Sequence, residues 1–298
     1  MHSSATLIAV VAVLIAEQAA PSLAALRRFD WLVEWRRYVD GLSDANVGWN
    51  GRAGLLLMVG LPVLLIGLLQ VALRQSLWGL PGLVFAVLLL FYCWGPRDLD
   101  QDVEAIVEAP DAQRKRDAAA SLMPAGAAST LDGPLLIEGV FAGALHRWFG
   151  PLFWFLLFGP AGALLYRIGA LLGGDTAHAE MPATQREGAR WLLAVLDWPV
   201  AQLMTLALAL AANFDAVFGA WREWHVGGAR LDTGFLGAAA RASVEIEIAD
   251  DDTDLADSGT LAASPALLEL RDAMSLVWRM LLLWLAVLAL FVIARFVG

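Results

Sequence analysis

The chain contains an uncharged run of 19 residues, Trp148 to Tyr166, bounded by His146-Arg147 on one side and Arg167 on the other. At about 1.5 Å rise per residue, a helix of this length nearly crosses the ~30 Å hydrocarbon core of a bilayer. Two Gly/Pro sequences, Gly150-Pro151 and residues 159–162 (GPAG), interrupt the run. It therefore predicts a membrane span with a broken helix.

The composition favours the same class of protein. Of the 298 residues, 59% are hydrophobic and 17% are charged, and the mean hydropathy is +0.64. Soluble domains carry roughly 25% charged residues, so we expect an integral membrane protein that has the lipid bilayer as a partner. The net charge of −10 does not favour nucleic acid as a partner. The single cysteine, Cys93, excludes a disulfide framework and a cysteine-rich metal site.

Six apolar segments are candidate spans. The first has only 12 residues, but the preceding MHSS lacks the basic residues of a signal peptide, so we expect an uncleaved, short or tilted helix. Pro62 lies in the second segment, where neighbouring groups in a membrane can satisfy the freed carbonyl. Residues 134–146, apolar apart from Glu138, lead into the fourth. The sequence thus predicts an all-α polytopic membrane protein, a single domain with about six transmembrane helices, at 5–16, 53–73, 77–95, 148–166, 191–212 and 273–297.

Polar segments separate these spans. Residues 27–52 combine five Arg with aromatic residues and predict an amphipathic interfacial helix. Residues 96–133 predict one or two cytoplasmic surface helices, broken at Pro110. In the extended polar region 213–272, the acidic run at 245–260 is typical of a flexible, solvated loop. Its Asp spacing lacks the glycine and the terminal Glu of an EF-hand, so no calcium site is predicted.

The distribution of Arg and Lys predicts the orientation. With the N-terminus outside, the inner segments 17–52, 96–147 and 213–272 carry 14 basic residues, and the outer segments 74–76 and 173–190 carry 3. We therefore expect six spans with the functional face in the cytoplasm. If the first segment is only re-entrant, the N-terminus moves inside and the other spans keep their orientation.

Two carboxylates lie in or next to apolar segments, Glu17 after the first and Asp197 within the fifth. An ionised side chain at the centre of a span costs about 2.5–3.5 kcal/mol, so such residues are functional candidates by default. Structural interpretations stay open for both. Glu17 can end its helix at the headgroup level, and Asp197 can cap a helix that begins at Trp198-Pro199.

Basic side chains flank the opening run. His146-Arg147 is either a binding pair for a phosphate or carboxylate or an anchor on the positive inner side. We expect Arg167 to snorkel to the far interface. His178 has no partners at metal-ligand spacing, so no metal role is predicted. The chain has no Walker A, GxSxG or HExxH pattern, and we predict no catalytic residue and no cofactor.

Residues Pro151–Arg167 (PLFWFLLFGPAGALLYR), followed by Leu196–Leu203 (LDWPVAQL), resemble the AmpE/CobD family of membrane proteins. The CobD branch has a similar PLF-x-x-x-x-GG-x-PGAL-x-YK stretch and a following Pro-Ala-Arg-Leu-like segment. Glu17 resembles an acidic position of both branches. The resemblance is specific over residues 150–205, and it implies that glycines there allow close helix approach. The matches are Pro151, Leu152, Phe153, Gly159, Gly162, Ala163, Leu164 and Tyr166, with Arg167 for the family's Lys.

The flanks of this stretch separate the two branches. CobD synthases, which condense adenosylcobyric acid with an aminopropanol phosphate, carry an ENxxDG-like motif before it and N-x-LD after it. This chain reads AGALHRWFG at Ala142–Gly150 and ALLG at residues 170–173. Groups that would position an activated carboxyl and an amine are therefore missing. Gln202 stands where either branch is expected to have an Arg. The segments RWFGPLFWF and LDW resemble the AmpE branch.

The resemblance implies a regulatory or sensory protein of the bacterial inner membrane, linked to β-lactamase induction and cell-wall recycling. It would bind a muropeptide-type or other small anionic ligand at the cytoplasmic face. Two alternatives stay open, a cobinamide-phosphate synthase and a small-solute transporter. A transporter would require inverted repeats with paired broken spans, for which the segments around Pro62 and Gly159-Pro160 are candidates. The oligomeric state is also open. Candidate ligand-binding residues are Glu17, His146, Arg147, Tyr166, Asp197 and Gln202.

Overall fold

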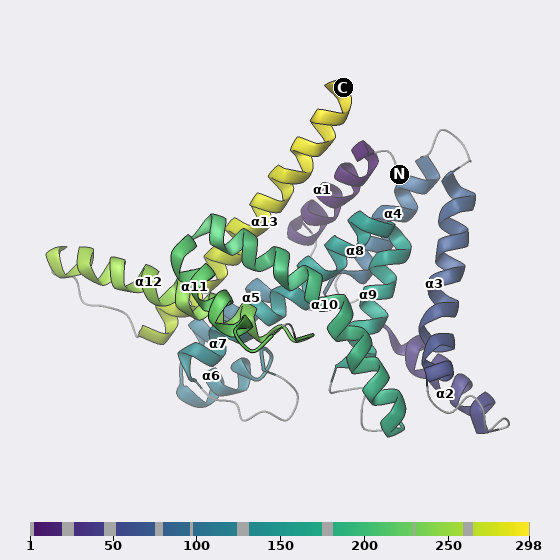
Figure 1. Ribbon diagram of the computed structural model, residues 1–298, viewed down its shortest axis with the longest axis horizontal. Helices are drawn as coiled ribbons and strands as arrows, with labels where there is room; N and C mark the ends of the chain where they lie inside the picture. The colour runs from purple at the N-terminus through teal and green to yellow at the C-terminus, as the bar shows by residue number, and fades with distance from the viewer. Residues whose placement is uncertain are drawn as a thin grey trace. The chain divides into compact units, whose positions relative to one another are not determined.

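The computed structural model describes residues 3–19, 27–44, 52–74, 80–95, 98–123, 131–174, 181–228, 230–258 and 265–297. Every regular element in these ranges is a helix (Figure 1), which confirms the all-α prediction. The helices are α1 (Ser3–Ala19), α2 (Asp30–Asp44), α3 (Arg52–Arg74), α4 (Leu80–Cys93), α5 (Leu99–Glu108), α6 (Ala112–Ala119), α7 (Gly133–Ala144), the π-helix η3 (Leu145–Phe149), α8 (Gly150–Phe158), α9 (Pro160–Gly173), α10 (Ala183–Ala211), α11 (Phe214–His225), α12 (Gly234–Ser258) and α13 (Pro265–Val297).

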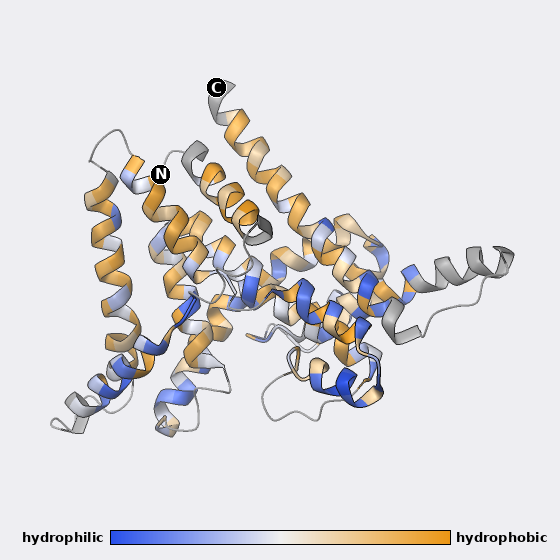
Figure 2. Ribbon diagram, turned by 180° about the vertical axis from the view of Figure 1, so that it is seen from behind, coloured by the Kyte–Doolittle hydropathy of each residue, from blue (hydrophilic) through white to orange (hydrophobic). Residues whose placement is uncertain are grey.

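Four segments among the described residues are long and apolar enough to cross a membrane, namely Ala53–Leu73, Gly133–Phe158, Ala183–Ala211 and Glu269–Ala294. Figure 2 shows apolar residues along most of α3 and the C-terminal part of α13, and polar residues along α6. The prediction of six spans is not supported. The apolar helices at Thr6–Ala16 and Leu80–Cys93 are only about 16 and 21 Å long at 1.5 Å per residue, less than a ~30 Å hydrocarbon core.

The run from Trp148 to Tyr166 is not one span. The helical segment that contains its first half begins earlier, at Gly133, and ends at Phe158. Gly159 then turns the chain with φ +72°, which glycine adopts at little cost, and α9 begins at Pro160. The predicted break at residues 159–162 is therefore confirmed. At Gly150-Pro151 the chain stays helical after the wider π-helical turn η3.

The described chain groups into two compact units, and the single domain expected from the sequence stays a prediction. Unit 1 comprises residues 1–96, 150–196 and 288–298, and unit 2 comprises residues 97–149 and 197–287. In unit 1, α3, α4 and α8 all contact α9 (Figure 1). The predicted helix within 27–52 is α2, with Leu32 and Val39 buried and Glu34 exposed. Helix α3 continues through Pro62, so it does not form a second broken span.

Helices α8 and α9 form a close hairpin around Gly159. A Cβ atom on Gly162 would lie 2.0 Å from the carbonyl oxygen of Trp154, and one on Gly150 would lie 2.0 Å from Cζ of Tyr166. The expected close approach at Gly162 is thus confirmed. The expectation for Arg167 is wrong, because its side chain is 5% exposed and its guanidinium lies 5.5 Å from the centre of the Phe29 ring.

In unit 2, α7 packs against α12 and α5, and α11 packs against α12. Helices α5 and α6 flank Pro110, as the sequence predicted for the polar segment 96–133. Residues 245–258, which we expected to be a loop, form the second half of α12. Residues 259–260 lie outside the described part of the chain. Residues 245–258 contain Glu, Ala and Ile twice each, and none of them is the Gly or Pro that opposes a helix strongly.

Candidate functional site

The candidate site is centred on a π-helical turn inside an apolar candidate span. Helix α7 continues through η3, Leu145–Phe149, into α8. Such turns are rare and are frequently found at functional sites. The turn contains His146 and Arg147, which are, with Glu138, the ionisable residues of Gly133–Phe158.

His146 contacts Asp197, one of the predicted candidates. The distance between Nε2 of His146 and Oδ2 of Asp197 is 3.0 Å, and the two side chains are 40% and 6% exposed. Asp197 lies within α10, which begins at Ala183 and continues through Pro199. The interpretation of Asp197 as a helix cap is therefore wrong. Instead, α10 places a buried carboxylate next to the π-helical turn.

Arg147 contacts α5 and the end of α6. Its Nη1 donates to Oδ2 of Asp102 at 2.6 Å, and its Nη2 donates to the carbonyl oxygen of Ser121 at 3.2 Å. Arg147 and Asp102 are 14% and 5% exposed, so this pair is more protected from water than most surface ion pairs. A hollow of about 300 Å³ adjoins it, lined by Asp102, Asp117 and Ser121 among others.

A third pair joins the same candidate span to another helix. Oε1 of Glu138 lies 2.7 Å from Nη1 of Arg241, which is on α12, and both side chains are about one-third exposed. The side chains of Glu138, His146 and Arg147 thus contact α12, α10 and α5 respectively. One apolar helix is held by charged groups of three different elements.

The other candidate residues with described side chains, Tyr166 and Gln202, make further contacts. Tyr166 is fully buried against Gly150 in unit 1. In unit 2, Gln202 accepts a hydrogen bond from Nε1 of Trp221 at 2.9 Å, and its Nε2 lies 3.5 Å from Nε2 of His225. Glu17 lies on α1, but its side chain and the whole of His178 are outside the described part of the chain.

The side chains around η3 do not favour binding of an anion unless one of the ion pairs of His146 or Arg147 opens. His146 and Arg147 do not form a shared cationic pocket, because each contacts a separate carboxylate. Sequence reasoning missed Asp102 and Ser121. Asp102 belongs to a run of acidic residues on α5 with no distinguishing pattern. The burial of its side chain is visible only in the folded chain.

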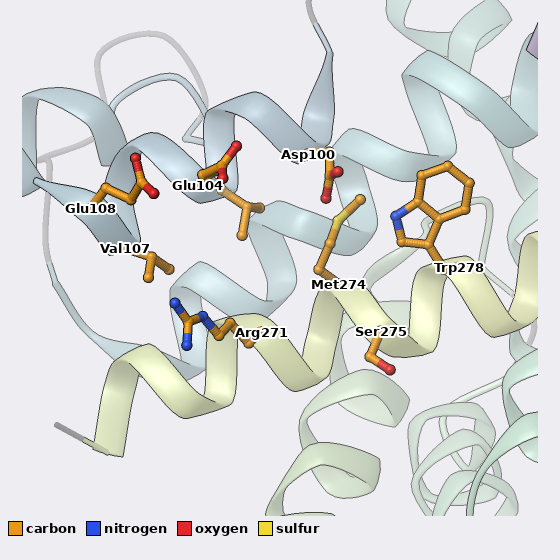
Figure 3. A pocket seen from close by; sticks show the side chains of 9 residues that line it. Asp100, Glu104, Val107, Glu108, Arg271, Met274, Ser275 and Trp278 are labelled. Carbon is orange, nitrogen blue, oxygen red and sulfur yellow. The ribbon is translucent and has the colours of Figure 1, made fainter. Parts of the chain in front are cut away.

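A second hollow lies on the other side of α5 (Figure 3). It has a volume of about 320 Å³. Asp100, Glu104 and Glu108 of α5 line one wall, and Arg271 and Trp278 of α13 line the other. Its carboxylates favour positive charge. No group of three or more His, Cys, Asp or Glu side chains suited to a metal ion occurs among the described residues.

The chain matches no protein-family model, no curated protein and no solved structure.

Proposed function

We propose that this chain is a multi-pass protein of the bacterial inner membrane with an AmpE-like regulatory function, linked to β-lactamase induction and cell-wall recycling. The resemblance of Pro151–Arg167 and Leu196–Leu203 to that branch supports the function. The four long apolar helices support the membrane location. The absence of the synthase motifs from Ala142–Gly150 and residues 170–173 favours regulation over catalysis.

The observation that carries the proposal is the set of ion pairs around η3. Ionisable residues inside membrane segments are costly and are retained mainly where they act. Here they contact three separate helices, so breaking one pair changes how the candidate span is held. A small anionic ligand at the cytoplasmic face would compete with Asp102 for Arg147. The hollow of about 300 Å³, lined by Asp102 and Ser121, the partners of Arg147, would be the route by which such a ligand reaches the guanidinium.

Signalling would then follow when an anionic group of the ligand replaces the carboxylate of Asp102 on Arg147. While Arg147 contacts Asp102 and Ser121, it connects the π-helical turn to α5 and to the end of α6. A ligand carboxylate or phosphate bound to the guanidinium, in a bidentate arrangement that arginine favours, would release that connection. The polar helices α5 and α6 would transmit the change to a cytoplasmic partner.

Deletion and complementation test the function in a host with inducible β-lactamase. We expect deletion to change induction and the wild-type chain to restore it. The variant Arg147→Gln should fail to restore it, because the cation that binds Asp102 is lost. The matched control is Arg114→Gln, since the pair between Arg114 and Asp111 is 71% and 54% exposed, and it should restore induction fully.

Two controls separate function from folding. Immunoblots report the amount of each variant in the membrane fraction. The double variant Arg147→Gln/Asp102→Asn removes both charges, so it should recover any lost abundance but not induction. Unchanged induction after deletion would contradict the proposal. So would rescue, by this chain, of a cobalamin auxotroph that lacks cobinamide-phosphate synthase.

A further inference from the structure

An exposed apolar stripe continues from α10 onto α11. On α10, Leu203, Leu206 and Leu210 are 40%, 53% and 63% exposed, and their spacing places them on one helix face. On α11, Phe214 and Phe218 are 51% and 45% exposed. The stripe therefore includes both the second half of a candidate membrane span, Ala183–Ala211, and the helix that follows it.

The position of α11 in the chain restricts its depth in a membrane. The candidate span ends at Ala211 and α11 begins at Phe214. Asn213 caps the new helix, because its side-chain oxygen accepts a hydrogen bond from the backbone N–H of Ala216 at 3.1 Å. With only two residues between the helices, the first turn of α11 lies close to the level at which the span leaves the hydrocarbon.

The exposed aromatic rings are ordered by contacts along their own face of α11, on which Phe214, Phe218 and Trp221 follow one another at helical spacing. The rings of Phe214 and Phe218 stack with centres 5.7 Å apart, and those of Phe218 and Trp221 stack at 5.6 Å. Trp221 donates to Gln202 of α10, and Val217 is fully buried. This face is thus held to α10 at its C-terminal end by Trp221, while Phe214 and Phe218 at its N-terminal end stay about half exposed.

We propose that Phe214 and Phe218 insert into the lipid interface and anchor the N-terminal half of α11 at the membrane surface. The occupant of this surface is the boundary between headgroups and acyl chains, where aromatic side chains are enriched and amphipathic helices bury their apolar face by about 5–10 Å. The inference rests on the proposed membrane location. The charged residues of α11, Asp215, Arg222 and Glu223, do not form a basic face, so apolar burial drives the contact and anionic lipid is not required.

Depth-dependent fluorescence quenching tests this in the full chain. Cys93 is the only cysteine and is buried, so Cys93→Ser supplies a background for single labels. A polarity-sensitive fluorophore is attached to Phe214→Cys or Phe218→Cys. The matched control is Glu223→Cys, because Glu223 is exposed on a different side of α11. A label at Leu206→Cys reports the depth of the candidate span itself. The proteins are reconstituted in phosphatidylcholine vesicles whose lipids carry a nitroxide at a shallow or a deep position.

We expect shallow nitroxides to quench the labels at positions 214 and 218 several-fold more than the label at 223. Deep nitroxides should quench the label at 206 best. Addition of anionic lipid should change the ratios little.

Quenching at 206 without quenching at 218 would overturn this inference and leave the membrane location standing. No quenching at 206 would overturn both. A blue-shifted but unquenched label at 218 would also overturn the inference, because a second copy or another protein would then cover the stripe.

Discussion

At the scale of single residues, the contact between Gly150 and Tyr166 leaves no room for a side chain at position 150. Tyr166 is fully buried, and its ring occupies the space that any side chain at position 150 would need. The hairpin of α8 and α9 therefore depends on the absence of a Cβ atom. Tyr166, which the sequence marked as a ligand-binding candidate, has here a packing role that explains why a glycine precedes Pro151.

The variant Gly150→Ala should lower the free energy of unfolding. The new Cβ atom would lie 2.0 Å from Cζ of Tyr166, and overpacking of this kind costs about 1–3 kcal/mol. The control is Gly60→Ala on α3, where no atom lies within 4 Å and alanine is favoured over glycine by up to ~1 kcal/mol. Thermal unfolding in detergent measures both. Equal melting temperatures for the two variants would contradict the packing at Gly150.

Residue patterns predicted part of the site. An ionisable residue in an apolar segment is visible in the sequence, so His146, Arg147 and Asp197 could be identified. The contact of His146 with Asp197 could not, because the two positions are 51 residues apart and nothing in their local sequence specifies a partner. The same applies to Asp102, which resembles its acidic neighbours until folding buries it.

At the scale of elements, a side chain from a third helix bonds to both sides of the turn between α8 and α9. Gln70 of α3 donates from Nε2 to the carbonyl oxygen of Phe158 and accepts from the backbone N–H of Ala161, both at 3.2 Å. The last carbonyls of a helix and the first N–H groups of the next have no partner within their helices. In a membrane such groups are costly to leave unsatisfied, so Gln70 stabilises the turn at Gly159.

The variant Gln70→Leu should loosen this turn. It keeps a similar size but removes both hydrogen bonds, each worth about 0.5–1.5 kcal/mol. Amide hydrogen exchange at residues 159–162 should become roughly tenfold faster, since about 1.4 kcal/mol corresponds to a factor of ten. Leu69→Ala, at an exposed neighbouring position, should leave the exchange unchanged. If Gln70→Leu also leaves it unchanged, Gln70 does not stabilise the hairpin.

The helical structure and its break at residues 159–162 could be predicted from the sequence, but the position at which the helix begins could not. Glycine and proline at 159–162 predicted the break correctly, because their backbone preferences act locally. The start of that helix at Gly133 was missed, because Glu138, His146 and Arg147 suggested a polar boundary. Their ion pairs with other helices allow the apolar helix to extend past them. Tertiary contacts of this kind are not encoded in any local window of sequence.

At the scale of the whole molecule, the number of spans changes the sidedness of the chain. Six spans place residues 17–52 and 96–133 on the same side of the membrane. Four spans place them on opposite sides, since only α3 then crosses between them. The basic residues no longer favour one orientation in that case. Seven lie in segments 1–52, 159–182 and 295–298, and eight in segments 74–132 and 212–268.

Labelling with a membrane-impermeant maleimide distinguishes the two arrangements. In the Cys93→Ser background, Glu34→Cys on α2 and Gln113→Cys on α6 introduce single exposed thiols. We expect only one of the two to react in intact cells and both to react after permeabilisation. Equal reaction of both in intact cells, or reaction of neither, would support six spans and would show that α4 crosses the membrane despite its length.

The residue ranges that make up the two units constrain the order in which the protein can fold. Unit 1 includes residues 288–298, and unit 2 includes residues up to 287. Neither unit is complete until the ribosome has synthesised the last helix. The early helices of each unit are therefore made while their final neighbours are still absent. Premature termination before α13 would leave both units incomplete, so degradation, rather than partial activity, is the expected fate of any truncated product.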